Sequence, residues 1–207
     1  MSKPLYVILD NGHGQETPGK RSPVWPDGTQ LFEYEFNRAI VNRVALGLTK
    51  AGIKVTRLVP ELHDVSITER IIRANNIITA ANRDGFQCLL VSVHANAGGG
   101  TGFEVLTSVG KTRSDELAEI FYQLAETVYL KNFPMRRDVL DGDSDKETNS
   151  VSILPKTNCP AVLTENLFMD TRKDCQLLMS DFGRDMIAEM HVKAIEEYAR
   201  RYAGFNQ

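Results

Sequence analysis

The chain of 207 residues has few cysteines and no excess of basic residues. Its three cysteines are an odd number without CxxC spacing, which argues against a disulfide framework and a cysteine-only zinc site. We expect Cys88 and Cys159 to be reduced core residues. The formal net charge is -3, which argues against a non-specific nucleic-acid binder, because such proteins carry a basic field.

Long apolar runs are also missing from the sequence. No stretch approaches the length of a membrane span, and the N-terminal apolar run ends at Asp10 without a small-residue cleavage site after it. The sequence therefore predicts a soluble protein without membrane insertion or a recognisable signal peptide. Repeats and low-complexity tracts are absent as well, and the length suits one compact catalytic domain, residues 1–207. We expect it to be a monomer.

Strand-like and helix-like patterns alternate along the chain. Short apolar runs predict strands at residues 5–9, 53–58, 87–94, 103–107, 151–154 and 161–165. Helical periodicity and end signals predict helices at residues 33–51, 66–83, 115–130 and 182–202. This alternation predicts an α/β fold, with a mostly parallel sheet and helices on both faces. The polar residues 136–150 are expected to form a mobile loop.

Two of the four histidines come directly at the ends of predicted strands. His13 lies just beyond the first strand, and His94 closes the third. Because ligands collect at the carboxyl ends of strands in open α/β sheets, both imidazoles are expected at one edge of the sheet. Taken singly, each is more often a hydrogen-bonding loop residue than a metal ligand. His63, in a polar connection, and His191, in the last helix, are expected to be non-catalytic.

A carboxylate at the start of the first predicted helix completes a possible metal site. A catalytic zinc needs about three protein ligands and one open position, and two histidines with one carboxylate form such a set. Glu33 precedes the apolar Phe36 and Ile40 by three and seven residues, which puts it on their inward face. Glu35 lies roughly 200° around the helix and is expected to face solvent. The helix phase therefore favours Glu33 as the third ligand.

A second carboxylate ends the apolar run at residues 161–165. A carboxylate at the end of a buried strand is costly unless it has a role or a partner. Near a metal site, Glu165 can take the proton of the attacking water and later pass it to the leaving amine. Taken singly, Glu33 and Glu165 are more readily explained as structural carboxylates in ion pairs than as functional residues. The hypothesis of a hydrolase depends on all four side chains converging.

Five motifs, in order, resemble the zinc-dependent N-acetylmuramoyl-L-alanine amidase family, sometimes called the amidase-3 type. They span nearly the whole chain and lie at residues 8–14, 33–37, 66–70 with 74–75, 91–96, and 160–165 followed by Phe168. The resemblance implies a three-layer α/β sandwich with a central mixed sheet. It implies Zn2+ held by His13, Glu33 and His94, with Glu165 as the catalytic carboxylate. The reaction it implies is hydrolysis of the amide bond between N-acetylmuramic acid and L-alanine in bacterial peptidoglycan.

The chain departs from the family pattern at two positions. Asn11 stands where the family usually has proline, and Pro155 stands where it often has arginine, so substrate contacts near Pro155 are not carried over. Many relatives are exported or have wall-binding repeats, and neither feature is recognisable here. The chain therefore resembles a stand-alone catalytic module, such as a phage-type lysin or an enzyme whose leader was trimmed. Such a module reaches the cell wall after release or export.

Three other functions compete with this hypothesis. Residues 14–20 match the GxxxxGK pattern of a phosphate-binding loop, but Arg21 replaces the expected Ser or Thr, and Pro23 and Pro26 forbid the helix that must follow. A zinc peptidase of the carboxypeptidase or aminopeptidase type uses similar ligands. A catalytically silent wall-binding module is the non-enzyme alternative, although the presence of all four functional side chains speaks against it. We expect the loop 138–150 to cover the cleft.

Overall fold

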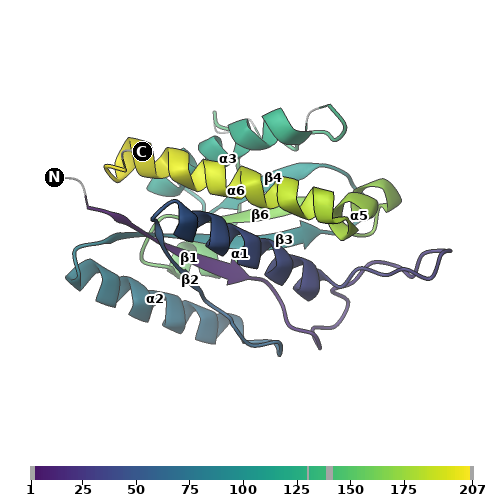
Figure 1. The fold of residues 1–207 in the computed structure, drawn as a ribbon, viewed down its shortest axis with the longest axis horizontal. Coiled ribbons are helices and arrows are strands. Elements are labelled where there is room, and N and C mark those ends of the chain that lie inside the picture. Colours follow the sequence, from purple (N-terminus) through teal and green to yellow (C-terminus); the bar gives the residue numbers. More distant parts are fainter. Residues whose placement is uncertain (1–2, 130, 139–141, 206–207) are drawn as a thin grey trace.

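A six-stranded sheet forms the centre of the molecule in the computed structural model, which describes residues 3–129, 131–138 and 142–205 (Figure 1). The strand order is β2-β1-β3-β6-β4-β5. The strands are β1 Leu5–Asn11, β2 Lys54–Arg57, β3 Gln87–Asn96, β4 Phe103–Thr107, β5 Lys146–Glu147 and β6 Ala161–Phe168. Four neighbouring pairs are parallel, and β4 runs antiparallel to β6. The predicted mostly parallel mixed sheet is confirmed.

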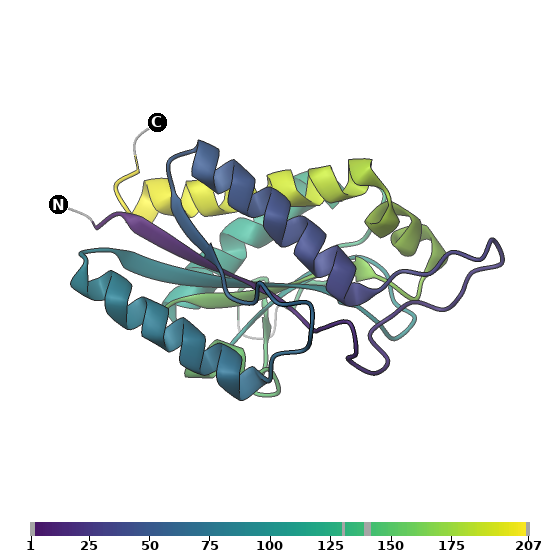
Figure 2. The same cartoon turned by 60° about the horizontal axis from the view of Figure 1, so that its bottom comes forward.

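Helices cover both faces of this sheet. They are α1 Glu33–Lys50, α2 Ile67–Arg83, α3 Arg113–Tyr129, α4 Ile153–Lys156, α5 Arg172–Met179 and α6 Asp181–Tyr202. Figures 1 and 2 show α1 and α6 on one side of the sheet and α2 on the other; α3 packs against α6, and α4 against α2. The predicted α/β sandwich is confirmed. Within the described residues, no helix combines the length and apolar character needed to cross a bilayer.

Alternate residues of the central strands contribute to two separate cores. Val7 and Leu9 of β1 join the core under α1, α3 and α6, whereas Ile8 joins the core under α2. Side chains along a strand point to opposite faces in turn, so the next residue in phase with Ile8 is Asp10. The α2 side of the sheet therefore carries polar groups where β1 reaches its carboxyl end.

The ends of two helices follow the predicted signals. Ser66 caps α2, with its Oγ accepting a hydrogen bond from the Glu69 backbone nitrogen at 3.2 Å. Gly52 follows α1 with a φ of 75°, a left-handed conformation that favours glycine. The cysteines are free, as expected. Cys88 is buried in the α2-side core, and Cys159 is half-buried and packs against the same core.

Two strands extend beyond their predicted ends. β3 continues to Asn96 and β6 to Phe168, so the prediction that His94 and Glu165 close their strands was wrong. The longer β6 pairs with β3 on one edge and with β4 on the other. Polar residues interrupt the apolar pattern at these ends, but pairing with the neighbouring strands continues the hydrogen-bonded ladder past them.

Two short elements were assigned wrongly from the sequence. The predicted strand at 151–154 is instead the beginning of α4, Ile153–Lys156. Its apolar residues Ile153 and Leu154 are buried in the α2-side core, so the apolar signal reflected burial rather than a strand. Helix α5 was not predicted. It carries the buried Asp174, whose carboxylate accepts hydrogen bonds from the backbone nitrogens of Phe168 and Gly102 at 3.0 and 3.1 Å.

The predicted loop at 136–150 contains a short strand. Residues Lys146–Glu147 pair in parallel with β4 as β5, and residues 139–141 lie outside the described residues. Ser150, at the end of this segment, borders a pocket that His13 and His94 also line. Its closure over the cleft stays a prediction.

Candidate active site

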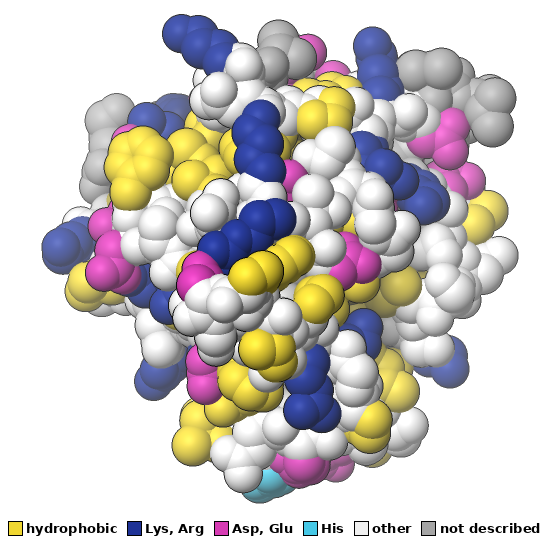
Figure 3. Space-filling view, turned by 90° about the vertical axis from the view of Figure 1, so that its right-hand side faces the viewer, with side chains coloured by type: hydrophobic (Ala, Val, Ile, Leu, Met, Phe, Trp, Pro, Cys, Tyr) yellow, Lys and Arg dark blue, Asp and Glu magenta, His cyan; other side chains and the backbone are white. Residues whose placement is uncertain are grey.

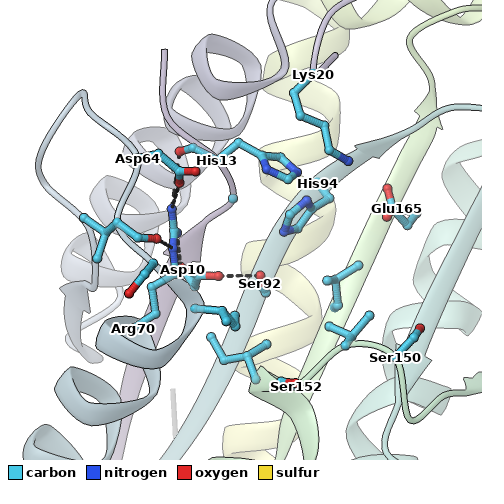
Figure 4. Close-up of a pocket in the computed structure, with 17 residues that line it drawn as sticks. Asp10, His13, Lys20, Asp64, Arg70, Ser92, His94, Ser150, Ser152 and Glu165 are labelled. Atoms are coloured by element: carbon cyan, nitrogen blue, oxygen red, sulfur yellow. Dashed lines mark hydrogen bonds and ion pairs between the residues drawn. The ribbon is translucent and has the colours of Figure 1, made fainter. Parts of the chain in front are cut away.

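A pocket of about 440 Å³ opens on the α2 side of the sheet. It contains three of the four predicted site residues, His13, His94 and Glu165. Figure 4 shows their side chains converging from three neighbouring segments of the sheet edge. Figure 3 views the molecule from the side toward which β1 and β3 run, and little histidine surface is visible there. The two histidine side chains are only 19% and 14% exposed.

The fourth predicted residue, Glu33, reaches the two histidines from the first turn of α1. Its Oε1 lies 3.0 Å from His94 Nδ1 and 3.4 Å from His13 Nε2. The two imidazole rings are nearly perpendicular, with centroids 4.9 Å apart. One ligand atom from each of the three residues lies within 4.8 Å of the others. Glu33 is buried and Glu35 is exposed, so the helix-phase argument that separated them is confirmed.

The turn after β1 fixes the position of His13. His13 has a φ of 61°, a left-handed conformation that a non-glycine residue rarely adopts. Its backbone oxygen accepts a hydrogen bond from Arg38 Nη1 at 2.9 Å, and Asn37 Nδ2 donates to the Gly12 oxygen at 3.0 Å. A Cβ at Gly12 would lie 2.0 Å from His94 Cε1. Glycine at this position is therefore what lets the two histidines come together.

A buried ion pair forms the floor of the pocket. Arg70 of α2 donates through Nη1 to Asp10 Oδ1 at 2.6 Å and to the Asn11 oxygen at 2.8 Å. Ser92 Oγ donates to the other oxygen of Asp10, also at 2.6 Å (Figure 4). Charge-assisted hydrogen bonds of this kind are short and strong. They tie α2 to the strand and turn that lead into His13.

The cluster fits a divalent cation. Glu33 Oε2 and His13 Nε2 are buried and form no hydrogen bond, an arrangement that is costly unless another group uses these atoms. Burial alone would raise the pKa of Glu33, but the close His13 and His94 imidazoles outweigh it and hold that pKa well below its usual range. Glu33 is therefore a carboxylate at neutral pH. Two imidazoles and one carboxylate form a donor set typical of catalytic zinc.

Glu165 lies beside this cluster on the adjacent strand. It pairs in register with His94 across β3 and β6, and its Oε2 is buried without a hydrogen bond. Burial raises the pKa of Glu165 to about 7, against the opposing effect of His94. A carboxyl group that titrates near neutrality can both accept and donate a proton.

Sequence reasoning missed Lys20 as a pocket residue. Its Nζ lies 3.8 Å from Glu33 Oε2, and in Figure 4 its side chain extends over the site between His94 and Glu165. The GxxxxGK match drew attention to this lysine for a different reason. No helix begins between Gly14 and Phe32, so the geometry of a phosphate-binding loop is not formed.

The other two histidines lie outside the lining of this pocket. His63 is exposed. His191 of α6 is fully buried, with Nε2 2.9 Å from Thr164 Oγ1 and Nδ1 2.8 Å from the Ile187 oxygen. Its contacts thus link α6 to β6, one residue before Glu165.

A family model described as N-acetylmuramoyl-L-alanine amidase matches residues 7–197. The chain belongs to this family. The chain is 32% identical over 203 residues to an endolysin of Bacillus phage SPP1, and the match covers 95% of this chain and 66% of that protein. It is 28% identical over 200 residues to the sporulation-specific N-acetylmuramoyl-L-alanine amidase of Bacillus subtilis strain 168, with 93% and 68% covered. The chain thus spans about two thirds of the length of these two relatives.

A solved structure supports the same assignment for this amidase-family chain. The crystal structure of an N-acetylmuramoyl-L-alanine amidase from Clostridium difficile 630 superposes with a TM-score of 0.78 at 27% identity, covering 96% of this chain and 98% of that one. The predicted family and fold are confirmed. The predicted reaction class, hydrolysis of the peptidoglycan amide bond, is confirmed at the level of the family.

Proposed function

We propose that this amidase-family chain binds Zn2+ through His13, Glu33 and His94 and uses Glu165 as its general base. The single observation that supports this most is the convergence of two imidazoles and a buried carboxylate within 4.8 Å. When bound, zinc supplies a Lewis acid that polarises the amide carbonyl and makes water more acidic. The substrate is the amide bond between N-acetylmuramic acid and L-alanine in bacterial peptidoglycan.

In this mechanism Glu165 moves the proton. Its carboxylate takes a proton from the attacking water and then gives it to the amine of the leaving L-alanine. The pKa of about 7 that burial gives this group suits both steps. Arg38 and Asn37 hold the His13 turn in place, and the Arg70–Asp10 pair fixes the floor beneath it.

We further propose that the chain acts as one catalytic unit. The sheet draws its strands from Leu5 to Phe168, and α6 packs against both α1 and α3. The four site residues therefore share one framework. A monomer that reaches the wall after release or export is part of the same proposal.

Digestion of purified peptidoglycan tests this function. The protein is compared in its zinc-loaded form, after chelation, and after zinc is restored, and new chain ends are identified by mass spectrometry. We expect free L-alanine amino termini from intact glycan with zinc, none after chelation, and recovery on restoration. The thermal midpoint should also fall on chelation, because a ligand that binds only the folded state stabilises it.

A zinc peptidase is the outcome that would contradict this proposal. Release of single amino acids from simple peptides, with wall material left intact, would reassign the substrate while keeping the metal site. The His94→Ala variant is the control for the metal. It should lose both the zinc-dependent activity and the zinc-dependent rise in thermal midpoint.

A further inference from the structure

A third ionisable residue continues the line of His94 and Glu165 across the sheet. Glu104 of β4 pairs directly with Glu165 of β6, which pairs with His94 of β3. Paired residues of neighbouring strands point to the same face, and adjacent strands lie about 4.8 Å apart. Glu104 therefore lies on the pocket side of the sheet, with its backbone about 10 Å from that of His94.

Glu104 is buried and holds two cationic side chains in place. Only 6% of its surface is exposed, and Asn96 Nδ2 donates to its Oε1 at 2.7 Å. Arg136 Nε donates to its Oε2 at 3.0 Å, and Lys146 Nζ lies 3.9 Å from the same oxygen. The Arg136 guanidinium also lies over the Phe168 ring at 5.0 Å. The Glu104 carboxylate and the Phe168 ring thus fix the orientation of the Arg136 guanidinium.

These cations line a hollow of about 440 Å³, which shares no lining residue with the pocket that contains His13, His94 and Glu165. Its lining residues are Glu104, Met135, Arg136, Arg137, Asp138 and Lys146. Three of them are cationic and two are acidic, so the lining has a formal charge of +1. The Arg136 and Lys146 side chains are 40% and 49% exposed, so both remain accessible to a ligand. One incoming carboxylate would bring the lining to neutrality.

We propose that this hollow, with Arg136 and Lys146 as its principal donors, binds a carboxylate of the substrate's peptide stem. The proposal depends on the function proposed above, because it takes the amide bond to be cleaved at the metal cluster. An extended peptide advances about 3.5 Å per residue, so the separation of about 10 Å between His94 and Glu104, beside which Arg136 and Lys146 lie, corresponds to the second or third residue beyond the scissile bond. Arginine presents a planar fork that matches a carboxylate.

The proposed subsite selects the substrate by charge. The free carboxylate of a stem residue would form ion pairs with the two cations, whereas a carboxamide at the same position would accept hydrogen bonds from them without an ion pair. Partly exposed ion pairs are worth little singly. We therefore expect two cooperating donors to give a preference of about tenfold, which is ~1.4 kcal/mol.

Binding of short stem peptides tests the proposal without depending on catalysis. Two peptides that begin with L-alanine are compared on the zinc-loaded protein, one with free carboxyl groups at the second and third residues and one with carboxamides there. We expect the carboxylate peptide to bind about tenfold more tightly, with a difference that shrinks as salt is added. Arg136→Gln and Lys146→Gln should each remove most of this difference.

Matched variants keep the result interpretable. Arg83→Gln makes the same charge change at an exposed position at the end of α2 and should keep the preference. Arg136→Lys retains the cation and should recover part of it. Thermal midpoints identify any variant that fails to fold. If Arg136→Gln fails to fold, Lys146→Gln still tests the proposal.

Two outcomes separate the two proposals. If the carboxylate and carboxamide peptides bind the wild-type protein equally, or if Lys146→Gln and Arg136→Gln keep the wild-type preference, the subsite is wrong. If the preference is present and depends on these side chains, but no peptidoglycan amide is cut with zinc, the subsite stands as a carboxylate-binding site and the proposed reaction fails.

Discussion

Glu165 shows how burial sets the chemistry of a single residue. Its backbone pairs with strands on both sides, which fixes its side chain on the pocket side of the sheet. The apolar run before Glu165 was sufficient to identify this residue from the sequence, because a buried acidic group is costly without a role or a partner. The elevated pKa, about 7, comes from burial first and then from the neighbouring charges of Glu33 and Glu104. Those neighbours come from other parts of the chain.

We predict that Glu165→Gln lowers kcat by about 10²- to 10⁴-fold, the range that a general base usually contributes. Glutamine keeps the shape of the side chain but cannot accept the proton. Zinc content should stay at the wild-type level, since Glu165 lies outside the His13, Glu33 and His94 cluster. Steady-state kinetics on a soluble muramoyl peptide and metal analysis of the purified variant measure both quantities.

Glu35→Gln is the matched control for this substitution. Glu35 lies on the exposed side of α1 and should leave kcat unchanged. A Glu165→Gln variant that hydrolyses at the wild-type rate would remove Glu165 from the mechanism.

At the scale of single elements, α2 is the helix that most directly supports the site. Its start and end were predicted closely, because Ser66 is a clear N-cap residue and the apolar periodicity is regular. The contact that matters for function could not be predicted in the same way. Arg70 meets Asp10 across 60 residues of chain, and helix periodicity does not identify its partner.

We predict that Arg70→Met destabilises the protein by about 3–5 kcal/mol, because removing one partner leaves a buried charge on Asp10 uncompensated. Urea denaturation followed by circular dichroism measures the change in the free energy of unfolding. Adding Asp10→Asn should recover part of the loss, since the neutral side chain does not need a cation.

Arg73→Met on the same helix provides the comparison. Arg73 pairs with Glu69 and Glu61 in partly exposed ion pairs, which are worth about 0–1 kcal/mol. Equal losses for the two variants would show that the Arg70–Asp10 pair has no special role in stability.

At the scale of the whole molecule, His191 connects the last helix to the catalytic strand and makes stability depend on pH. Burial lowers the pKa of His191 from 6.5 to about 4. The folded state therefore favours the neutral ring, while the unfolded chain takes up a proton below about pH 6.5. Its contribution to stability is fully present above that pH and is lost as pH falls toward 4.

We predict that this histidine contributes a loss of about 3 kcal/mol between pH 6.5 and 4. The His191→Gln variant keeps a polar side chain toward Thr164 and cannot titrate in this window. Free energies of unfolding, measured from pH 7 down to pH 4.5, should fall less steeply for the variant than for the wild type. Parallel pH profiles would mean that His191 does not carry this dependence.

The sequence by itself determined the alternation of the longer strands and helices, the family, and the four residues of the candidate site. It could do so because buried strands, capped helices and ordered motifs are local patterns. The helix phase alone separated Glu33 from Glu35 for the same reason.

Only the tertiary structure decided which groups meet. Pairing with neighbouring strands extended β3 and β6 beyond their apolar runs. The hydrogen bonds of the buried Asp174 hold α5 in place, and local periodicity did not indicate this helix. Lys20, Arg70 and Glu104 became parts of the site or its surroundings through contacts with residues distant along the chain. Charge and burial at these positions depend on packing between elements, and a one-dimensional pattern does not contain that information.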